Sequence, residues 1–241
     1  MSKLRIVVSA LQSFGLISAA FTAVASAETI PCVNGRAGEY SCKNVDLQSV
    51  IDLAKSGLKT EGSARPPADP GDKKGSGSWG WTDPTNGREY AIMGLANKTS
   101  FVDISEPTKP VHVADLPAHS VGSLWREVNV INSHAVIVSE SHAHGLQILD
   151  LTQLSKLSRD RVHILEETAH YGHFGSSHTI SVNEKTGYAY ALGSDTCDAG
   201  AHVVDLRNPK KPKFVTCIDR KVFDPLPIKP PQSPMGFFAA G

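Results

Sequence analysis

The sequence predicts an all-β protein built from three similar units, each with about four short antiparallel strands. Two observations favour this fold: one apolar pattern recurs three times, and short runs of β-branched and aromatic residues are bounded by turn residues. The composition agrees, because the 241 residues include 20 Gly and 15 Pro and 40% of them are hydrophobic. This balance is typical of a turn-rich globular protein and excludes long-helix, collagen-like and strongly disordered chains.

The three units occupy residues 79–116, 124–167 and 177–219. Each contains an aspartate between apolar residues, at Asp103, Asp150 and Asp205. A run with strand propensity precedes each aspartate by about ten residues and is too short to be a helix. We therefore expect each aspartate to lie at a strand end and to accept hydrogen bonds from the backbone amides of the next turn.

The units differ after the aspartate. A Pro-containing turn follows in the first and third units, whereas residues 151–161 of the second unit read LTQLSKLSRDR. We expect this stretch to form a short helical excursion.

Repeats of this length with four strands each are typical of β-propeller blades. One such sheet has two apolar faces and can bury both only by packing between neighbouring sheets. The sequence therefore predicts a partial β-propeller of about three four-stranded blades. Propellers close with about four to eight blades, so three units predict an incomplete ring.

The N-terminal residues 1–27 have the pattern of a secretory signal peptide. Lys3 and Arg5 precede an apolar run that ends at Ala25-Ser26-Ala27. A retained membrane anchor is the alternative. We expect a secreted or cell-surface protein with no membrane span in the mature chain. Lys plus Arg and Asp plus Glu both total 24, so the chain lacks the basic field that binds nucleic acid.

Four cysteines follow the predicted cleavage site, at Cys32, Cys42, Cys197 and Cys217. An even number in a chain bound for an oxidising compartment favours disulfides. Four cysteines allow three pairings; Cys32 with Cys42 would close a short Gly-rich loop, and Cys197 with Cys217 would join neighbouring strands of the third unit. A cysteine metal site is the alternative, but no C-x-x-C spacing is present.

The remaining segments are not expected to form blades. Residues 28–55 form an N-terminal disulfide-loop segment, and residues 56–78 are a flexible linker of Gly, Ser, Pro and charged residues without an apolar period. Residues 220–241 form an irregular Pro-rich tail.

Several separated motifs resemble those of a known family. They are V-D-I-S-x-P-x-x-P from Val102, W-G-W-T-D-P-x-x-G-R-E-Y-A from Trp79, S-L-W-R-E-V from Ser123, and P-C-V-N-G-x-A-G-x-Y-x-C-x-N-V-D-L from Pro31. Together they resemble the LVIVD-repeat proteins of the choice-of-anchor B family. This resemblance implies a secreted or surface-displayed β-propeller without an assigned activity, held by different C-terminal anchors in different members. Members continue through further blades, whereas here the pattern gives way near Lys221, so we expect a truncated copy.

Alignment of the three units places Trp79, Arg126 and His178 at the start of the innermost strand of each blade. In a propeller, residues at this position face the central channel. Together with Glu127 they form a candidate anion site. The alternative is that they seal the mouth of the channel by packing and hydrogen bonding.

Ten histidines raise the question of a metal site. His170 and His173 could fold over the channel beside His178 and hold a divalent metal. His142 and His144 would share one side of a strand, but a glycine follows them and predicts a solvent-exposed hairpin. No H-E-x-x-H, G-x-S-x-G or Walker motif is present.

We therefore expect a secreted, non-catalytic interaction module without a cofactor, whose partner is an extracellular ligand or a surface protein. The alternative is a metal-dependent enzyme with its site in the channel around Arg126 and His178. Asn97 begins an N-K-T sequon in a predicted turn, which is glycosylated only if the source organism glycosylates.

Overall fold

The structure is a computed structural model that describes residues 28–53, 57, 75–120 and 122–219. The predicted signal peptide (1–27), most of the predicted linker (58–74) and the predicted tail (220–241) lie outside the described residues.

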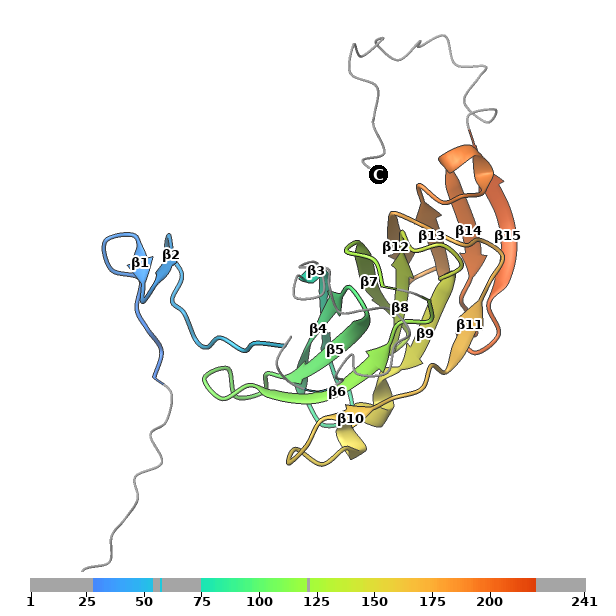
Figure 1. Cartoon of the computed structure of the whole chain (residues 1–241). Coiled ribbons are helices and arrows are strands. Elements are labelled where there is room, and N and C mark those ends of the chain that lie inside the picture. The colour runs from blue at the N-terminus through green and yellow to red at the C-terminus, as the bar shows by residue number, and fades with distance from the viewer. Residues whose placement is uncertain (1–27, 54–56, 58–74, 121, 220–241) are drawn as a thin grey trace, which may run out of the picture.

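The described chain is all-β, as predicted, and three sheets follow one another along it (Figure 1). A small hairpin of β1 (Arg36–Ala37) and β2 (Tyr40–Ser41) precedes them. The first sheet contains β3 (Gly75–Thr82), β4 (Glu89–Leu95), β5 (Lys98–Asp103) and β6 (Val111–Pro117). The second contains β7 (Arg126–Ile131), β8 (His134–Ser139), β9 (Leu146–Asp150) and β11 (Ala169–Tyr171). The third contains β12 (Thr179–Asn183), β13 (Tyr188–Leu192), β14 (Ala201–Asp205) and β15 (Lys213–Ile218).

Within each sheet these four strands are antiparallel neighbours in chain order. A fifth strand, β10 (His163–Ile164), comes from the second unit but pairs in parallel with β6 of the first sheet. The fourth strand of the second sheet is therefore β11, which begins two residues beyond the predicted unit boundary at 167. The expected helical excursion is present as the 3₁₀ helix η2 (Leu151–Lys156); a second one, η3 (Cys197–Ala199), precedes β14.

The aspartates of the three repeats occupy equivalent turns. Asp103, Asp150 and Asp205 each accept a hydrogen bond from the backbone amide two residues later, at 3.0, 3.1 and 2.9 Å. The intervening amides, of Ile104, Leu151 and Leu206, donate to the carbonyls of Glu89, Ser133 and Gly187 at 2.8, 2.9 and 2.8 Å. The turn-capping role predicted for the aspartates is therefore confirmed, and the sequence repeat is a repeat of hydrogen-bond geometry.

Two apolar cores separate the three sheets. The core between the first and second sheets includes Phe101 and Ile137, and the core between the second and third includes Val136 and Val204. Because adjacent residues of a strand point to opposite faces, Val136 and Ile137 of β8 serve different cores. The second sheet is thus buried on both faces, which explains the continuous apolar run in β8.

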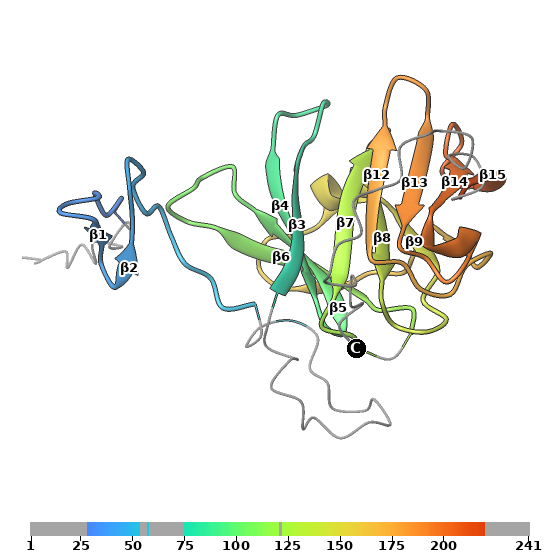
Figure 2. The same cartoon turned by 90° about the horizontal axis from the view of Figure 1, so that it is seen from above.

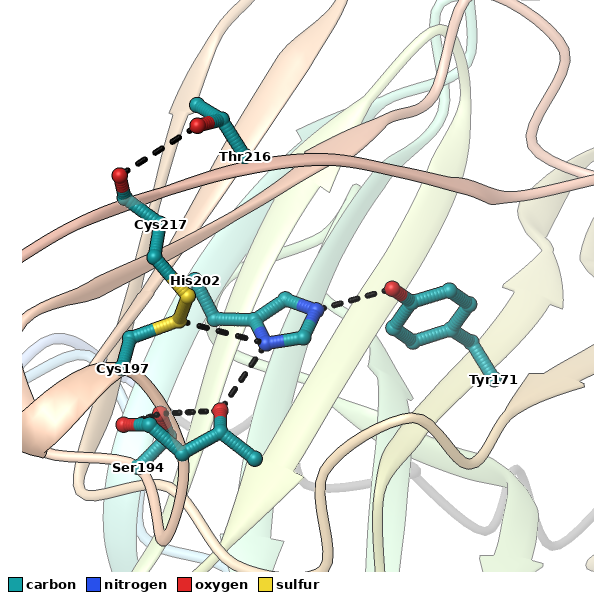
Figure 3. Close-up of a disulfide and its surroundings, with 7 residues drawn as sticks. Tyr171, Ser194, Cys197, His202, Thr216 and Cys217 are labelled. Carbon is teal, nitrogen blue, oxygen red and sulfur yellow. Dashed lines mark hydrogen bonds between the residues drawn. A yellow bond between two sulfur atoms is a disulfide. The ribbon is translucent and has the colours of Figure 1, made fainter.

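Both cysteine pairs favoured by the sequence are disulfides in the structure, Cys32–Cys42 and Cys197–Cys217. The second joins η3 to the edge strand β15 (Figure 3). Beside it, the buried His202 contacts the Tyr171 hydroxyl through Nε2 at 2.8 Å, and its Nδ1 lies 3.7 Å from the sulfur of Cys197. Burial lowers the pKa of His202, so this side chain links the second and third sheets as a neutral ring.

Replacing Asp150 by alanine tests the repeated turn. Burial alone would raise the pKa of the Asp150 carboxyl, but hydrogen bonds from Thr152 lower it below its usual value. A lowered pKa means that this stabilisation is present above about pH 4 and is lost as the pH falls further. We expect Asp150→Ala to lower the free energy of unfolding at pH 7 by about 1–2 kcal/mol in urea denaturation. Glu184→Ala, in the β12–β13 turn, is the control; an equal loss there would contradict the prediction.

Removing the second disulfide tests how far β15 depends on it. Cys197 and Cys217 are 20 residues apart in sequence, and closing a loop of this length contributes about 3 kcal/mol. We expect the double variant Cys197→Ser with Cys217→Ser to lose this stability and to expose the amides of β15 to hydrogen exchange. The double variant Cys32→Ser with Cys42→Ser should leave exchange in β15 unchanged, because that disulfide lies in the N-terminal hairpin.

Candidate functional site

A pocket lies where the first strands of the three sheets meet. Strand β7 contacts β3 on one side and β12 on the other (Figure 2). At one end of these strands is a pocket with a volume of about 440 Å³. It is lined by Ser76, Gly77, Trp125, Arg126, Glu127, His178 and Thr179. The structure therefore brings together Arg126 and His178, two of the three residues that the alignment placed in a channel.

The third predicted residue, Trp79, does not line the pocket. Strand β3 begins at Gly75, earlier than the predicted boundary between linker and first unit, so Trp79 lies in the middle of the strand and pairs with Ile92. The aromatic side chain at the pocket is instead Trp125, which directly precedes β7 and is 50% exposed.

Two small residues of β3 join it to β7 at the pocket. The Ser76 hydroxyl donates to the carbonyl oxygen of Arg126 at 2.8 Å and accepts from the Arg126 amide at 2.9 Å. A Cβ atom at Gly77 would lie 2.6 Å from that same carbonyl oxygen and 2.7 Å from Oε1 of Glu127. Only glycine permits this approach. Both residues were predicted to lie in the linker, because residues 56–78 are rich in Gly, Ser, Pro and charge and have no apolar period.

The side chain of Arg126 is directed into the protein. It is only 2% exposed and is the largest of the fully buried side chains among the described residues. Its Nε donates to the Leu95 carbonyl at 2.9 Å, Nη2 to the Ala96 carbonyl at 3.4 Å, and Nη1 to Nε2 of His144 at 2.6 Å. Burial lowers the pKa of Arg126 to about 10, so the group stays charged at neutral pH. It joins the β4–β5 hairpin of the first sheet to the β8–β9 loop of the second.

His144 was predicted to lie in an exposed hairpin, and this prediction was wrong. His142 is exposed in the β8–β9 loop, but His144 is fully buried against Arg126. Its Nδ1 donates to the Gly145 carbonyl at 3.0 Å, so Nε2 is free to accept from the guanidinium. Burial first, and the charge of Arg126 second, lower the pKa of His144 to about 3. The ring is therefore neutral at physiological pH.

The other ionisable side chains that line the pocket are His178 and Glu127, and Glu140 contacts His178 from beside it. His178 lies just before β12, its side chain is 65% exposed, and its Nδ1 contacts the carboxylate of Glu140. The backbone of Glu140 is held in turn by Trp125, whose carbonyl accepts from its amide at 3.2 Å. Glu127 is half-buried, and its carboxylate accepts a hydrogen bond from the adjacent Val128 amide at 3.2 Å.

The three predicted metal ligands, His170, His173 and His178, have different contacts. His170 donates to the His144 carbonyl at 2.8 Å and stacks on His119 with ring centroids 3.5 Å apart. His173 stacks on Tyr171 at 4.7 Å, whereas His178 contacts Glu140 at the pocket. Within the described ranges, no three His, Cys, Asp or Glu side chains form a group that could hold a metal ion.

Comparison with known proteins found no matching family model, curated protein or solved structure. The part of the chain that the structure describes also contains no helix of the length and apolar character needed to cross a membrane.

The neutral state of His144 predicts an acid-sensitive fold. Its pKa in the folded protein is about 3, compared with 6.5 for an ordinary histidine, so protonation favours the unfolded chain. This contribution is fully present above about pH 6.5 and is lost as the pH falls towards 3. Between pH 6 and pH 4 we expect the wild type to lose about 2 kcal/mol more than His144→Gln, whose amide oxygen can still accept from Arg126 but cannot be protonated. Parallel pH profiles of the two proteins in urea denaturation would contradict this assignment.

Proposed function

We propose that this chain is a secreted, non-catalytic binding module with the architecture of a partial β-propeller, and that its ligand occupies the pocket between β3, β7 and β12. This proposal is supported chiefly by one observation: the first strands of three successive sheets meet and line one pocket. Such a position corresponds to the channel of a propeller, a common location for ligands in repeat architectures.

The repeat geometry supports the propeller arrangement. Three antiparallel meanders of the same strand order follow one another, each ends its third strand with the same aspartate turn, and apolar cores fill the spaces between them. The sequence motifs that resemble the LVIVD-repeat family point the same way. Two disulfides, which are typical of extracellular proteins, support secretion together with the signal-peptide pattern.

The chemistry of the pocket favours binding over catalysis. Nucleophilic catalysis needs a hydroxyl or thiol beside a free base. The Ser76 hydroxyl is engaged on both sides by the Arg126 backbone, and the His178 imidazole faces a carboxylate rather than a nucleophile. The remaining lining side chains include the Trp125 indole, the Glu127 carboxylate and the Thr179 hydroxyl, groups that orient a ligand by packing and hydrogen bonding.

Metal analysis of the purified mature chain separates this function from the metal-dependent enzyme. The binding module should contain only substoichiometric metal after dialysis, and His178→Ala should change neither metal content nor thermal stability. The enzyme requires stoichiometric zinc or calcium that is lost in His178→Ala and kept in the control His142→Ala, an exposed histidine outside the pocket lining. That result would overturn the proposed function.

A further inference from the structure

The polar side chains at the pocket differ in whether another side chain engages them. The Glu140 carboxylate is in direct contact with the His178 imidazole. Arg126 and Glu127 are neighbours on β7, so their side chains point to opposite faces of the strand. The Arg126 guanidinium is occupied by the Leu95 and Ala96 carbonyls and by His144. Among the described residues, no ion pair involves Glu127.

The carboxylate of Glu127 is held at the wall of the pocket. Gly77 brings the backbone of β3 so close to it that a Cβ atom would lie 2.7 Å from Oε1. The side chain is half-buried. Partial burial weakens the hydration of a carboxylate, which strengthens its attraction for a cation that enters the pocket.

An aromatic side chain lies at the same pocket. The Trp125 side chain is half-exposed, and the face of an indole ring attracts organic cations more strongly than any other aromatic side chain does. Indole is not a metal ligand. An aromatic face beside a carboxylate therefore favours an organic cation, whose alkyl or planar part packs on the ring, over a metal ion.

We propose that the pocket binds a guanidinium or alkylammonium group, with its charge against Glu127 and its apolar part against Trp125. This proposal rests on the binding function and specifies its ligand class. A volume of about 440 Å³ accommodates one extended cationic side chain or a linear amine. The cation can come from an arginine or lysine side chain of an extracellular protein or from a free polyamine.

Fluorine NMR of protein labelled with 5-fluorotryptophan tests the proposal directly. The chain has three tryptophans, and the resonance missing in Trp125→Phe belongs to Trp125. Titration with N-acetyl-arginine N-methylamide should shift this resonance saturably. The citrulline analogue, which has nearly the same shape but no charge, should leave it unchanged. A separate titration with spermidine distinguishes the two sources of the cation. A saturable shift of the Trp125 resonance with spermidine assigns free polyamines as ligands. A shift with the arginine probe alone assigns a protein side chain.

Variants identify the residues responsible. Glu127→Gln keeps the shape of the side chain and should weaken the arginine probe by about threefold to fivefold, as expected for a partly exposed ion pair. Trp125→Ala, followed by calorimetry, should weaken it by about threefold. Glu106→Gln is the matched control, because Glu106 is exposed and pairs with Lys109 away from the pocket. Trp81 is buried in the core between the first and second sheets. An unchanged Trp81 resonance in labelled Glu127→Gln and Glu106→Gln therefore verifies that these variants are folded.

The outcomes separate this inference from the proposed function. Equal binding of the arginine and citrulline probes at Trp125 would overturn the cation preference while leaving a binding pocket. No shift with any cation, or a shift of the Trp79 resonance alone, would overturn the cation site. Only stoichiometric metal bound through His178 would overturn the binding function itself.

Discussion

The arrangement of the first two sheets depends on a buried guanidinium, that of Arg126, for which the described residues supply no carboxylate partner. A buried cation costs several kcal/mol unless polar groups replace the lost water. For Arg126 these groups are the carbonyls of Leu95 and Ala96 and the neutral ring of His144. Leu95 and Ala96 lie in the β4–β5 hairpin of the first sheet, and His144 lies in the β8–β9 loop of the second. The Arg126 side chain therefore holds this hairpin against this loop. Because the guanidinium is fixed on one face of β7, Glu127 is fixed on the other.

The pocket follows from the same constraint. Ser76 binds both backbone groups of Arg126, so β3 is held against β7 at the point where the guanidinium is anchored. Gly77 then lies over Glu127. Trp125, on the other side of Arg126 in the sequence, remains exposed. Trp125, Arg126 and Glu127 are thus consecutive in sequence, and strand alternation separates the buried Arg126 from the two side chains of the proposed binding site.

The sequence predicted the features that depend on local patterns. Alternation and turn residues indicated the strands, the repeated aspartates indicated equivalent turns, and the cysteine spacing favoured the observed pairs. Features decided by tertiary contacts were missed. Ser76 and Gly77 form part of a strand despite low strand propensity, because β7 binds them. His144 is buried because a distant arginine satisfies it, and no local pattern records that contact.

The parallel pairing of β10 with β6 has a consequence for how the protein unfolds. Residues His163 and Ile164 lie in the second unit of the sequence, yet they complete the first sheet in space. Beyond them the chain returns to the second sheet as β11. The second unit therefore supplies an outer strand to the first sheet, and the two sheets cannot separate fully without breaking the pairing of β10 with β6. We expect two repeats linked in this way to unfold together, and deletion of the second unit by recombination would leave the first sheet without its outer strand β10.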